Sequence, residues 1–171
     1  MDDYLLVGYM GVLRTYMDVP SISHCVVDLA PANEFDMWFE DPAAVPVGVP
    51  VLAVGFAATD VAPQVDEMAR QGFDAVRLHG KGKMPGGVLL GFEPVGFDTG
   101  TWHTWRCIGD LVTDVATATG IRPGPYGLIV DEPDARRAAE WLNIPENGDE
   151  KVARWTSVAL VFRDSGCFTQ V

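Results

Sequence analysis

Basic side chains are scarce in this 171-residue chain, where twelve Lys and Arg stand against twenty-four Asp and Glu and the formal net charge is −12. A nucleic-acid-binding surface needs clustered Lys and Arg to neutralise phosphates, so the shortage argues against nucleic acid as a partner. The imbalance is uneven. Residues 1–69 contain eleven acids and one base, Arg14, whereas residues 70–171 contain thirteen acids and eleven bases. The acidic N-terminal part favours a basic protein partner, because complementary charge speeds and orients encounter; plain solubility is the alternative interpretation.

Cysteine is also scarce. The three cysteines, Cys25, Cys107 and Cys167, are widely spaced and form no CxxC pair. This spacing predicts neither a disulfide framework nor a metal site. A reducing compartment fits best, so we expect a cytoplasmic protein.

Long apolar runs without interruption are missing. The longest charge-free run covers residues 42–59 and contains Pro42, Pro46 and Pro50, each of which lacks a backbone donor. We interpret this run as a loop that leads into a strand, and we expect no membrane segment. The chain begins Met1-Asp2-Asp3, which lacks the positive start of a secretory signal.

The common catalytic motifs are missing as well. No serine stands in Gly-x-Ser-x-Gly, and neither HExxH nor an EF-hand loop occurs. Gly82 and Gly87 have Walker A spacing, but Val88 stands where that phosphate-binding loop needs lysine. A dinucleotide-binding GxGxxG loop fails in the same region, because the third glycine comes one residue late. The sequence therefore predicts a protein that is not an enzyme and has no cofactor.

One catalytic alternative stays open. His103 lies four residues before Cys107, with Asp98 nearby in the sequence, and a Cys–His pair can activate a thiolate. Cys107 also opens an expected helix with a buried apolar face, where a free cysteine is usually a small core residue. His24 and Cys25 are expected on a strand, where neighbouring side chains face opposite ways and form no compact site. A small cytosolic enzyme with a site near His103 and Cys107 is the alternative to a binding protein.

The apolar pattern predicts the elements of the fold. Short β-branched runs bounded by turn residues indicate strands, and apolar residues at helical spacing before a glycine indicate helices. The expected strands are Tyr4–Met10, His24–Leu29, Val49–Phe56, Asp74–Leu78, Val88–Phe92, Leu128–Val130 and Ser157–Phe162; the expected helices are Asp60–Gln71, Cys107–Thr119 and one capped by Asp131. These elements predict a single α+β domain over residues 1–171, with about seven strands and three helices.

Two segments are candidates for binding a partner. Residues 79–87 contain four glycines and a proline, which predict a loop. Lys81 and Lys83 stand among these glycines, so the loop is a candidate cationic finger that reaches a partner's pocket. A hairpin loop kept soluble by two lysines is the alternative. The predicted contact residues in this segment are His79, Gly80, Lys81, Gly82 and Lys83.

The second segment, residues 34–41, mixes large apolar groups with four acids. Trp38 and Phe39 are candidate anchors inside a charged rim, with Asp36 and Glu40 in that rim. The alternative is that one aromatic side chain packs inward while the acids stay in water. A second aromatic patch, at residues 102–105, is interpreted as two tryptophans that close the core beside a helix start.

Residues 88–141 resemble small actinobacterial and phage proteins, some of them encoded beside toxin genes. The matching stretches are Val-Leu-Leu-Gly-Phe-Glu-Pro-Val-Gly-Phe-Asp at 88, Trp-His-Thr-Trp-Arg-Cys at 102, Tyr-Gly-Leu-Ile at 126 and Ala-Ala-Glu-Trp at 138. The size, acidity and Gly-Lys-Gly loop also resemble the immunity factor of the mycobacterial tuberculosis necrotizing toxin. The resemblance implies a cytosolic antitoxin that binds an NAD glycohydrolase domain and blocks its NAD pocket.

This implication agrees with the charge and loop pattern. A toxin inhibitor needs complementary charge, anchors and a projection that fills a pocket, and it needs no catalysis. Our hypothesis is that residues 79–87 enter the toxin's active site while the acidic N-terminal part contacts its basic rim. A phage or structural adaptor that assembles with itself is a further alternative.

Overall fold

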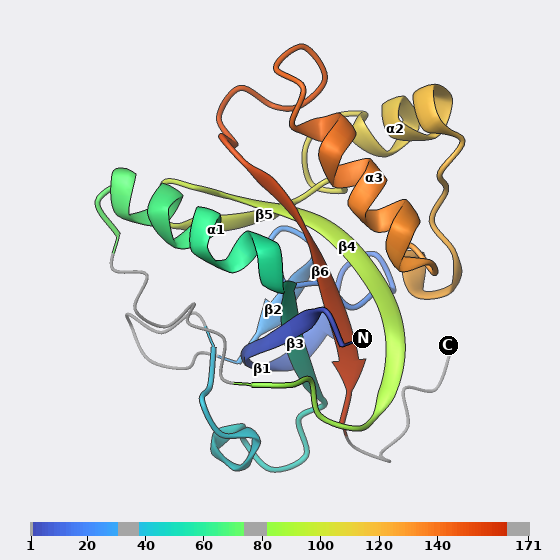
Figure 1. The fold of residues 1–171 in the computed structure, drawn as a ribbon. Helices are drawn as coiled ribbons and strands as arrows, with labels where there is room; N and C mark the ends of the chain where they lie inside the picture. Colours follow the sequence, from blue (N-terminus) through green and yellow to red (C-terminus); the bar gives the residue numbers. More distant parts are fainter. Residues whose placement is uncertain (1, 31–37, 74–81, 164–171) are drawn as a thin grey trace.

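Six antiparallel strands curl into one sheet in the computed structural model, which describes residues 2–30, 38–73 and 82–163 (Figure 1). The strands are β1 (Tyr4–Thr15), β2 (Val27–Leu29), β3 (Val51–Ala57), β4 (Val88–Asp98), β5 (Thr101–Thr104) and β6 (Trp155–Phe162). Their order across the sheet is β2-β1-β3-β6-β4-β5. Every neighbouring pair is antiparallel. The expected α+β domain is confirmed, with six described strands where about seven were predicted.

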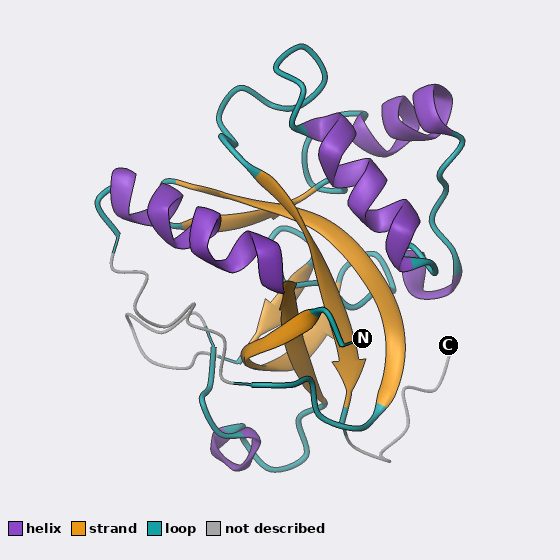
Figure 2. Cartoon of the chain, viewed as in Figure 1, coloured by secondary structure: helices purple, strands orange, loops and turns teal. Residues whose placement is uncertain are grey.

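Three α-helices lie beside the sheet. α1 (Ala58–Arg70) follows β3 directly, while α2 (Leu111–Thr119) and α3 (Glu132–Leu142) come between β5 and β6. Figure 2 shows α1 beside one part of the sheet and α2 and α3 together beside another. The described connections contain two short 3-10 helices, η1 (Pro42–Ala44) and η3 (Pro125–Gly127). Within the described residues, we find no helix that combines the length and the apolar character needed to cross a membrane.

The residues of β6 show how the core is organised, because all of them are buried. Val158, Leu160 and Phe162 belong to one apolar cluster, which α1 also joins. Trp155 and Ala159 belong to a second cluster, which contains side chains of α2 and α3. Successive strand residues point to opposite faces, so β6 has apolar layers on both sides. This explains why its sequence is an almost continuous apolar run.

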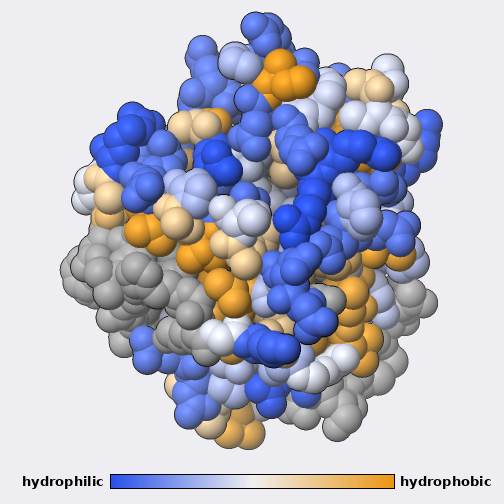
Figure 3. Space-filling view, viewed as in Figure 1, coloured by the Kyte–Doolittle hydropathy of each residue, from blue (hydrophilic) through white to orange (hydrophobic). Residues whose placement is uncertain are grey.

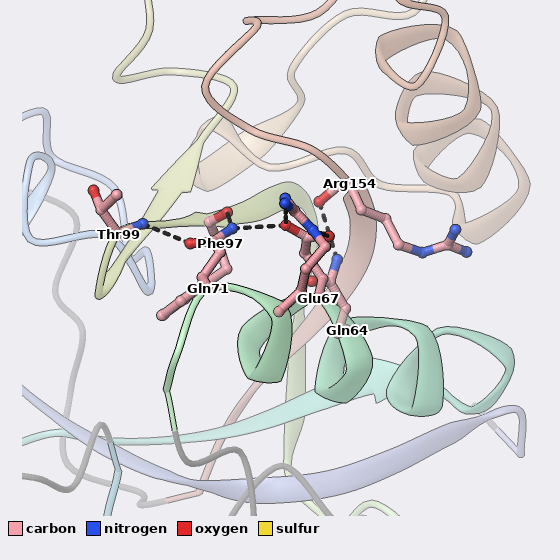
Figure 4. Close-up of polar contacts among 7 residues, drawn as sticks. Gln64, Glu67, Gln71, Phe97, Thr99 and Arg154 are labelled. Atoms are coloured by element: carbon pink, nitrogen blue, oxygen red, sulfur yellow. Dashed lines mark hydrogen bonds and ion pairs between the residues drawn. The ribbon is translucent and has the colours of Figure 1, made fainter.

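The C-terminal end of α1 is tied to the turn between β4 and β5 (Figure 4). The side chain of Gln71 accepts a hydrogen bond from the Thr99 amide at 2.8 Å and donates one to the Phe97 carbonyl at 3.3 Å. Two turns earlier, Gln64 donates to the Arg154 carbonyl at 3.0 Å. One row of polar side chains therefore holds the helix to the β4–β5 turn and to the chain that enters β6.

All three predicted helices are present, but the details of where they begin and how they are capped differ from the predictions. Asp60 does not cap α1, because it lies inside the first turn and its carboxylate accepts hydrogen bonds from Thr156 and Arg154. Asp131 occupies the N-cap position of α3 as expected, although its side chain makes no capping hydrogen bond. α2 begins at Leu111, later than predicted, so the residues from 107 to 110 precede the helix.

The strand predictions need three corrections. Residues 128–130 form no strand, and only an isolated bridge joins Ile129 to Phe92. β2 begins at Val27, so the residues 24–26 lie in a turn. β5 was missed, although it forms a hairpin with β4. The expected strand at residues 74–78 lies outside the described residues.

Candidate functional site

The described parts of the two candidate binding segments, residues 38–41 and 82–87, contact the same edge of β1. Lys83 forms an isolated antiparallel bridge with Leu5, and Phe39 forms one with Tyr9. On its other edge β1 pairs with β3 at both positions, and β2 joins β1 only from Val12 onward. Four residues of a strand span about 13 Å, so the segments lie close together along this edge. Their backbones cover amides and carbonyls that a bare edge would expose.

Backbone hydrogen bonds fix both segments to β1. The Leu6 amide donates to the Gly82 carbonyl at 2.9 Å. Tyr9 and Phe39 exchange two bonds, at 2.9 Å and 2.8 Å. A register shift between Leu6 and Gly8 in the pairing with β3 marks a bulge. A bulge changes which residues of a strand point their amides to a given edge, which explains how both Leu6 and Tyr9 serve this one.

The segments also share one small apolar cluster. Its buried members are Leu6, Tyr9, Ala53 and Val161. Phe39 from one segment and Met84 from the other pack against it. Residues that are far apart in the sequence are thus held by the same part of the sheet, which makes their exposed neighbours one surface.

Two glycines make room for this arrangement. A Cβ atom on Gly55 would lie 2.3 Å from the sulfur of Met84. On Gly8 it would lie 2.7 Å from Cδ1 of Trp38 and 2.9 Å from Cβ of the same residue. Close contact between these side chains and the sheet therefore requires residues without a side chain.

Charged side chains are exposed in the two segments, and Asp2 lies beside one of them. The Lys83 side chain is 84% exposed, and its ammonium lies 3.6 Å from a carboxylate oxygen of Asp2. Glu40 and Asp41 are exposed beside Phe39, and Asp41 accepts a hydrogen bond from the first turn of η1. We call the exposed residues of this region the β1-edge surface; they are Asp2, Glu40, Asp41, Gly82 and Lys83.

Apolar area lies next to this polar group along the chain. Val88 and Leu89, at the start of β4, are exposed. In Figure 3, hydrophilic side chains cover much of the visible face, while hydrophobic ones gather below α1 and over the lower part of β4. Apolar area with a charged rim is the usual composition of a protein-binding surface.

Trp38 was interpreted either as an exposed anchor or as a side chain that packs inward, and the structure excludes the exposed anchor. Trp38 is only 3% exposed, and its ring centroid lies 6.1 Å from that of Phe56 and 5.8 Å from that of Trp102. The alternative, that one aromatic side chain of the segment packs inward, is confirmed. Gly82, Lys83 and Glu40 are exposed as expected of contact residues. Asp36, His79, Gly80 and Lys81 lie outside the described residues.

The candidate catalytic pair His103 and Cys107 has a third neighbour, Cys25, that was not expected there. Cys25, His103 and Cys107 each place a possible ligand atom within 4.8 Å of the others. Cys25 was expected on a strand beside His24, where the two residues form no compact site. It lies instead in a turn before β2, next to His103 and Cys107. Asp98 is not in this group: it pairs with Thr101 at the end of the β4–β5 hairpin.

Cys107 is held by its surroundings without being activated. Its sulfur lies 3.5 Å from Nδ1 of His103, and it accepts hydrogen bonds from the Thr104 amide at 3.3 Å and the Ser23 hydroxyl at 3.6 Å. Burial raises the pKa of the Cys107 thiol. A thiol with a raised pKa is a poor nucleophile at neutral pH, so the geometry gives thiol catalysis little support.

A buried carboxyl group lies beyond Thr104 and was missed in the sequence. Glu93 is fully buried on β4 and accepts hydrogen bonds from the hydroxyls of Ser21, at 2.9 Å to each oxygen, and of Thr104. Burial raises the pKa of Glu93 to about 7, although these bonds and the nearby charge of Arg106 act in the opposite direction. Its position among apolar strand residues, Phe92 and Val95, was the available signal.

A polar cavity of about 180 Å³ lies where α1, α3 and β6 meet. Asp60, Arg136, Glu140 and Arg154 line it, and Arg154 lies 3.4 Å from Asp60. Sites for small organic molecules usually have about 300 Å³ or more. The paired charges and the small volume indicate a role in joining the elements.

Comparisons with known proteins give no match to this chain among family models, curated proteins or solved structures. The resemblance to immunity factors stays a prediction.

Proposed function

We propose that this chain is an immunity protein that works in the cytoplasm and inhibits a toxin enzyme by covering its active site. The β1-edge surface is the contact region. The observation that carries the proposal is that residues 38–40 and 82–84, chosen separately from the sequence, are bonded to one edge of one strand. An inhibitor needs no reaction chemistry, but it needs a rigid support for such a surface.

The charges favour a partner with a basic rim and with an acidic group within reach of Lys83. Asp2, Glu40 and Asp41 are exposed acids and suit a basic rim. Lys83 is the cation among the described residues of this surface, and its ammonium suits a carboxylate of the partner. A toxin domain that hydrolyses NAD, as the sequence resemblance implies, is the first partner to test.

The first experiment compares the wild-type chain with two charge-reversal variants, Lys83→Glu and Lys151→Glu. The chain has three lysines, and both of these are exposed. Tagged proteins are used to capture partners from host lysate at low salt, and each captured protein is then purified and assayed as an enzyme in the presence of the chain. We expect a basic toxin domain that the wild type and Lys151→Glu inhibit one to one, and that Lys83→Glu inhibits at least about tenfold less.

Two results would contradict the proposal. If all three proteins inhibit the toxin equally, the contact region lies elsewhere on the chain. If the tagged wild-type chain captures further copies of the same chain and no other protein, self-assembly becomes the better interpretation. Measuring the molecular mass of the purified chain at several concentrations would test that directly.

A further inference from the structure

A second site, independent of the β1-edge surface, lies where the turn before β2 meets the end of the β4–β5 hairpin. Cys25 comes from the turn, His103 from β5 and Cys107 from the turn that follows β5. Cys25 is exposed, and the other two are half-buried. Their ligand atoms lie within 4.8 Å of one another, although the sequence separates them widely.

The distances match a small tetrahedral metal site. Zinc binds sulfur at about 2.3 Å and nitrogen at about 2.0 Å, so tetrahedral ligands lie about 3.5 Å (N to S) and about 3.8 Å (S to S) apart. The sulfur of Cys107 lies 3.5 Å from Nδ1 of His103. The third ligand atom, from Cys25, lies within about an ångström of the required spacing, which a side-chain rotation supplies.

The surroundings orient the half-buried sulfur of Cys107. The Thr104 amide and the Ser23 hydroxyl both point hydrogens at Sγ of Cys107. Ser23 is itself fixed, because its hydroxyl oxygen accepts a bond from the Cys25 amide at 3.3 Å. Donors of this kind stabilise a thiolate that binds a metal and hold it in place. The turn before β2 and the end of the β4–β5 hairpin with its following turn thus supply both the ligands and the groups that orient them.

We propose that Cys25, His103 and Cys107 bind a zinc ion, with water as the fourth ligand. Two sulfurs and one imidazole nitrogen are the kinds of ligand that zinc binds, whereas magnesium and calcium bind oxygen ligands. The exposure of Cys25 leaves one side of the site open to water. The ion joins the turn before β2 to the β4–β5 hairpin, two segments that pack together on the same side of the core.

The test uses the full-length chain, fully reduced and stripped of metal with a chelator. Zinc chloride is titrated into the wild type and into Cys25→Ser, Cys107→Ser and Cys167→Ser. Cys167→Ser removes the one cysteine that is not among the three proposed ligands and is the matched control. We expect about one zinc ion per wild-type chain, unchanged binding in the control, and at least about tenfold weaker binding in the two ligand variants.

Cobalt chloride supplies a readout that a merely structural effect does not produce. Tetrahedral cobalt with thiolate ligands shows visible absorption bands and a near-ultraviolet thiolate-to-cobalt band. We expect both in the wild type and the control, and loss of the thiolate band in proportion to the cysteines removed. Circular dichroism of each metal-free variant confirms that it is folded.

Absence of zinc binding by the reduced wild type, with all thiols free by titration, would overturn the proposal. Equal loss of binding in Cys167→Ser would overturn the assignment to these three residues. Zinc that binds equally well to a folded Cys107→Ser variant would do the same. None of these results bears on the inhibitor proposal, because that proposal rests on Lys83 and the other residues of the β1-edge surface.

Discussion

Ser21 donates its hydroxyl to both carboxyl oxygens of Glu93, at 2.9 Å each, in a part of the core where neither side chain is exposed. A buried ionised carboxylate is unfavourable unless hydrogen bonds and nearby positive charge compensate for lost water. Here desolvation is the largest influence, and it raises the pKa of Glu93 to about 7. The group therefore holds a proton over a range where an exposed glutamate has lost it.

This shift predicts that unfolding depends on pH with a definite sign. Between about pH 4.5 and about pH 7, the folded chain holds a proton on Glu93 that the unfolded chain releases. Stability from this group is therefore fully present below pH 4.5 and is lost as pH rises through about 7. The change is on the order of 3 kcal/mol at most.

Glu93→Gln tests this prediction. The amide is close in shape to a protonated carboxyl group and stays neutral at every pH, so the variant lacks the decline with rising pH. The measurement is urea unfolding of both proteins from pH 5 to pH 8, with the difference in free energy of unfolding plotted against pH. Other carboxyl groups cancel in this difference. Parallel curves for the two proteins would show that Glu93 titrates normally.

Sequence reasoning found the helices because their evidence is local. Both α1 and α3 have apolar residues at helical spacing; α1 was predicted nearly in full, and α3 begins directly after the Asp131 that was expected at its N-cap. β5 was missed for a related reason: it has four residues, too few for a period to show. Its turn did carry a signal. That signal is Gly100, because the structure has positive φ at both turn residues, 43° at Thr99 and 92° at Gly100, and a two-residue hairpin turn favours glycine there.

The candidate sites depended on non-local pairing, which sequence spacing does not contain. Nothing in residues 25 and 107 indicates that two loops bring them together. Likewise, the segments at 38–40 and 82–84 were chosen for composition, and their common support on β1 became visible only in the sheet. Trp38 shows the limit of composition: an aromatic residue among acids fits both an exposed anchor and a core residue. The glycine that receives it, Gly8, decides between them.

Gly8 and Gly55 predict a graded pair of stability effects. An alanine at Gly8 meets the Cβ, Cγ and Cδ1 atoms of Trp38, a rigid side chain whose Cβ moves only with the backbone. An alanine at Gly55 meets the far end of Met84, a flexible side chain that can rotate away. We therefore expect Gly8→Ala to cost about 2–3 kcal/mol and Gly55→Ala about 1 kcal/mol or less.

Denaturant unfolding measures which of the two variants loses more stability. Inhibition of the toxin then tests whether the position of Met84 matters for binding. Gly55→Ala changes stability little, but it displaces Met84. It should therefore weaken inhibition of the toxin several-fold under conditions in which the variant is fully folded. An equal loss of stability in the two variants would contradict the packing argument.

Gln71 predicts a measurable contribution of side-chain hydrogen bonds at the end of α1 (Figure 4). Its amide accepts from Thr99 and donates to Phe97. Gln71→Ala leaves these backbone groups without that partner and should lower the free energy of unfolding by about 1–2 kcal/mol. Asp66→Ala, an exposed change in the same helix, is the control and should be neutral or slightly stabilising, because alanine favours helix. If both variants unfold at the same urea concentration as the wild type, the tie contributes nothing.

The acids of the β1-edge surface predict how inhibition depends on salt. If Glu40 faces a basic rim, attraction between the two proteins speeds their encounter, and ions in solution screen it over about 8–10 Å at physiological salt. The association rate of the wild type with its toxin should therefore fall as salt rises. Glu40→Lys should lower the rate at low salt by about tenfold and flatten the salt dependence, with a smaller effect on dissociation.

Glu150→Lys is the matched control for this prediction, since Glu150 is also an exposed acid but lies in the connection between α3 and β6, away from the β1-edge surface in the sequence. Both variants change the net charge of the chain by the same amount. Surface plasmon resonance or stopped-flow fluorescence gives the rates at several salt concentrations. If the two variants slow association equally, total charge alone steers the encounter and Glu40 has no special place in it. A larger effect of Glu40→Lys locates the basic rim of the partner opposite this edge of β1.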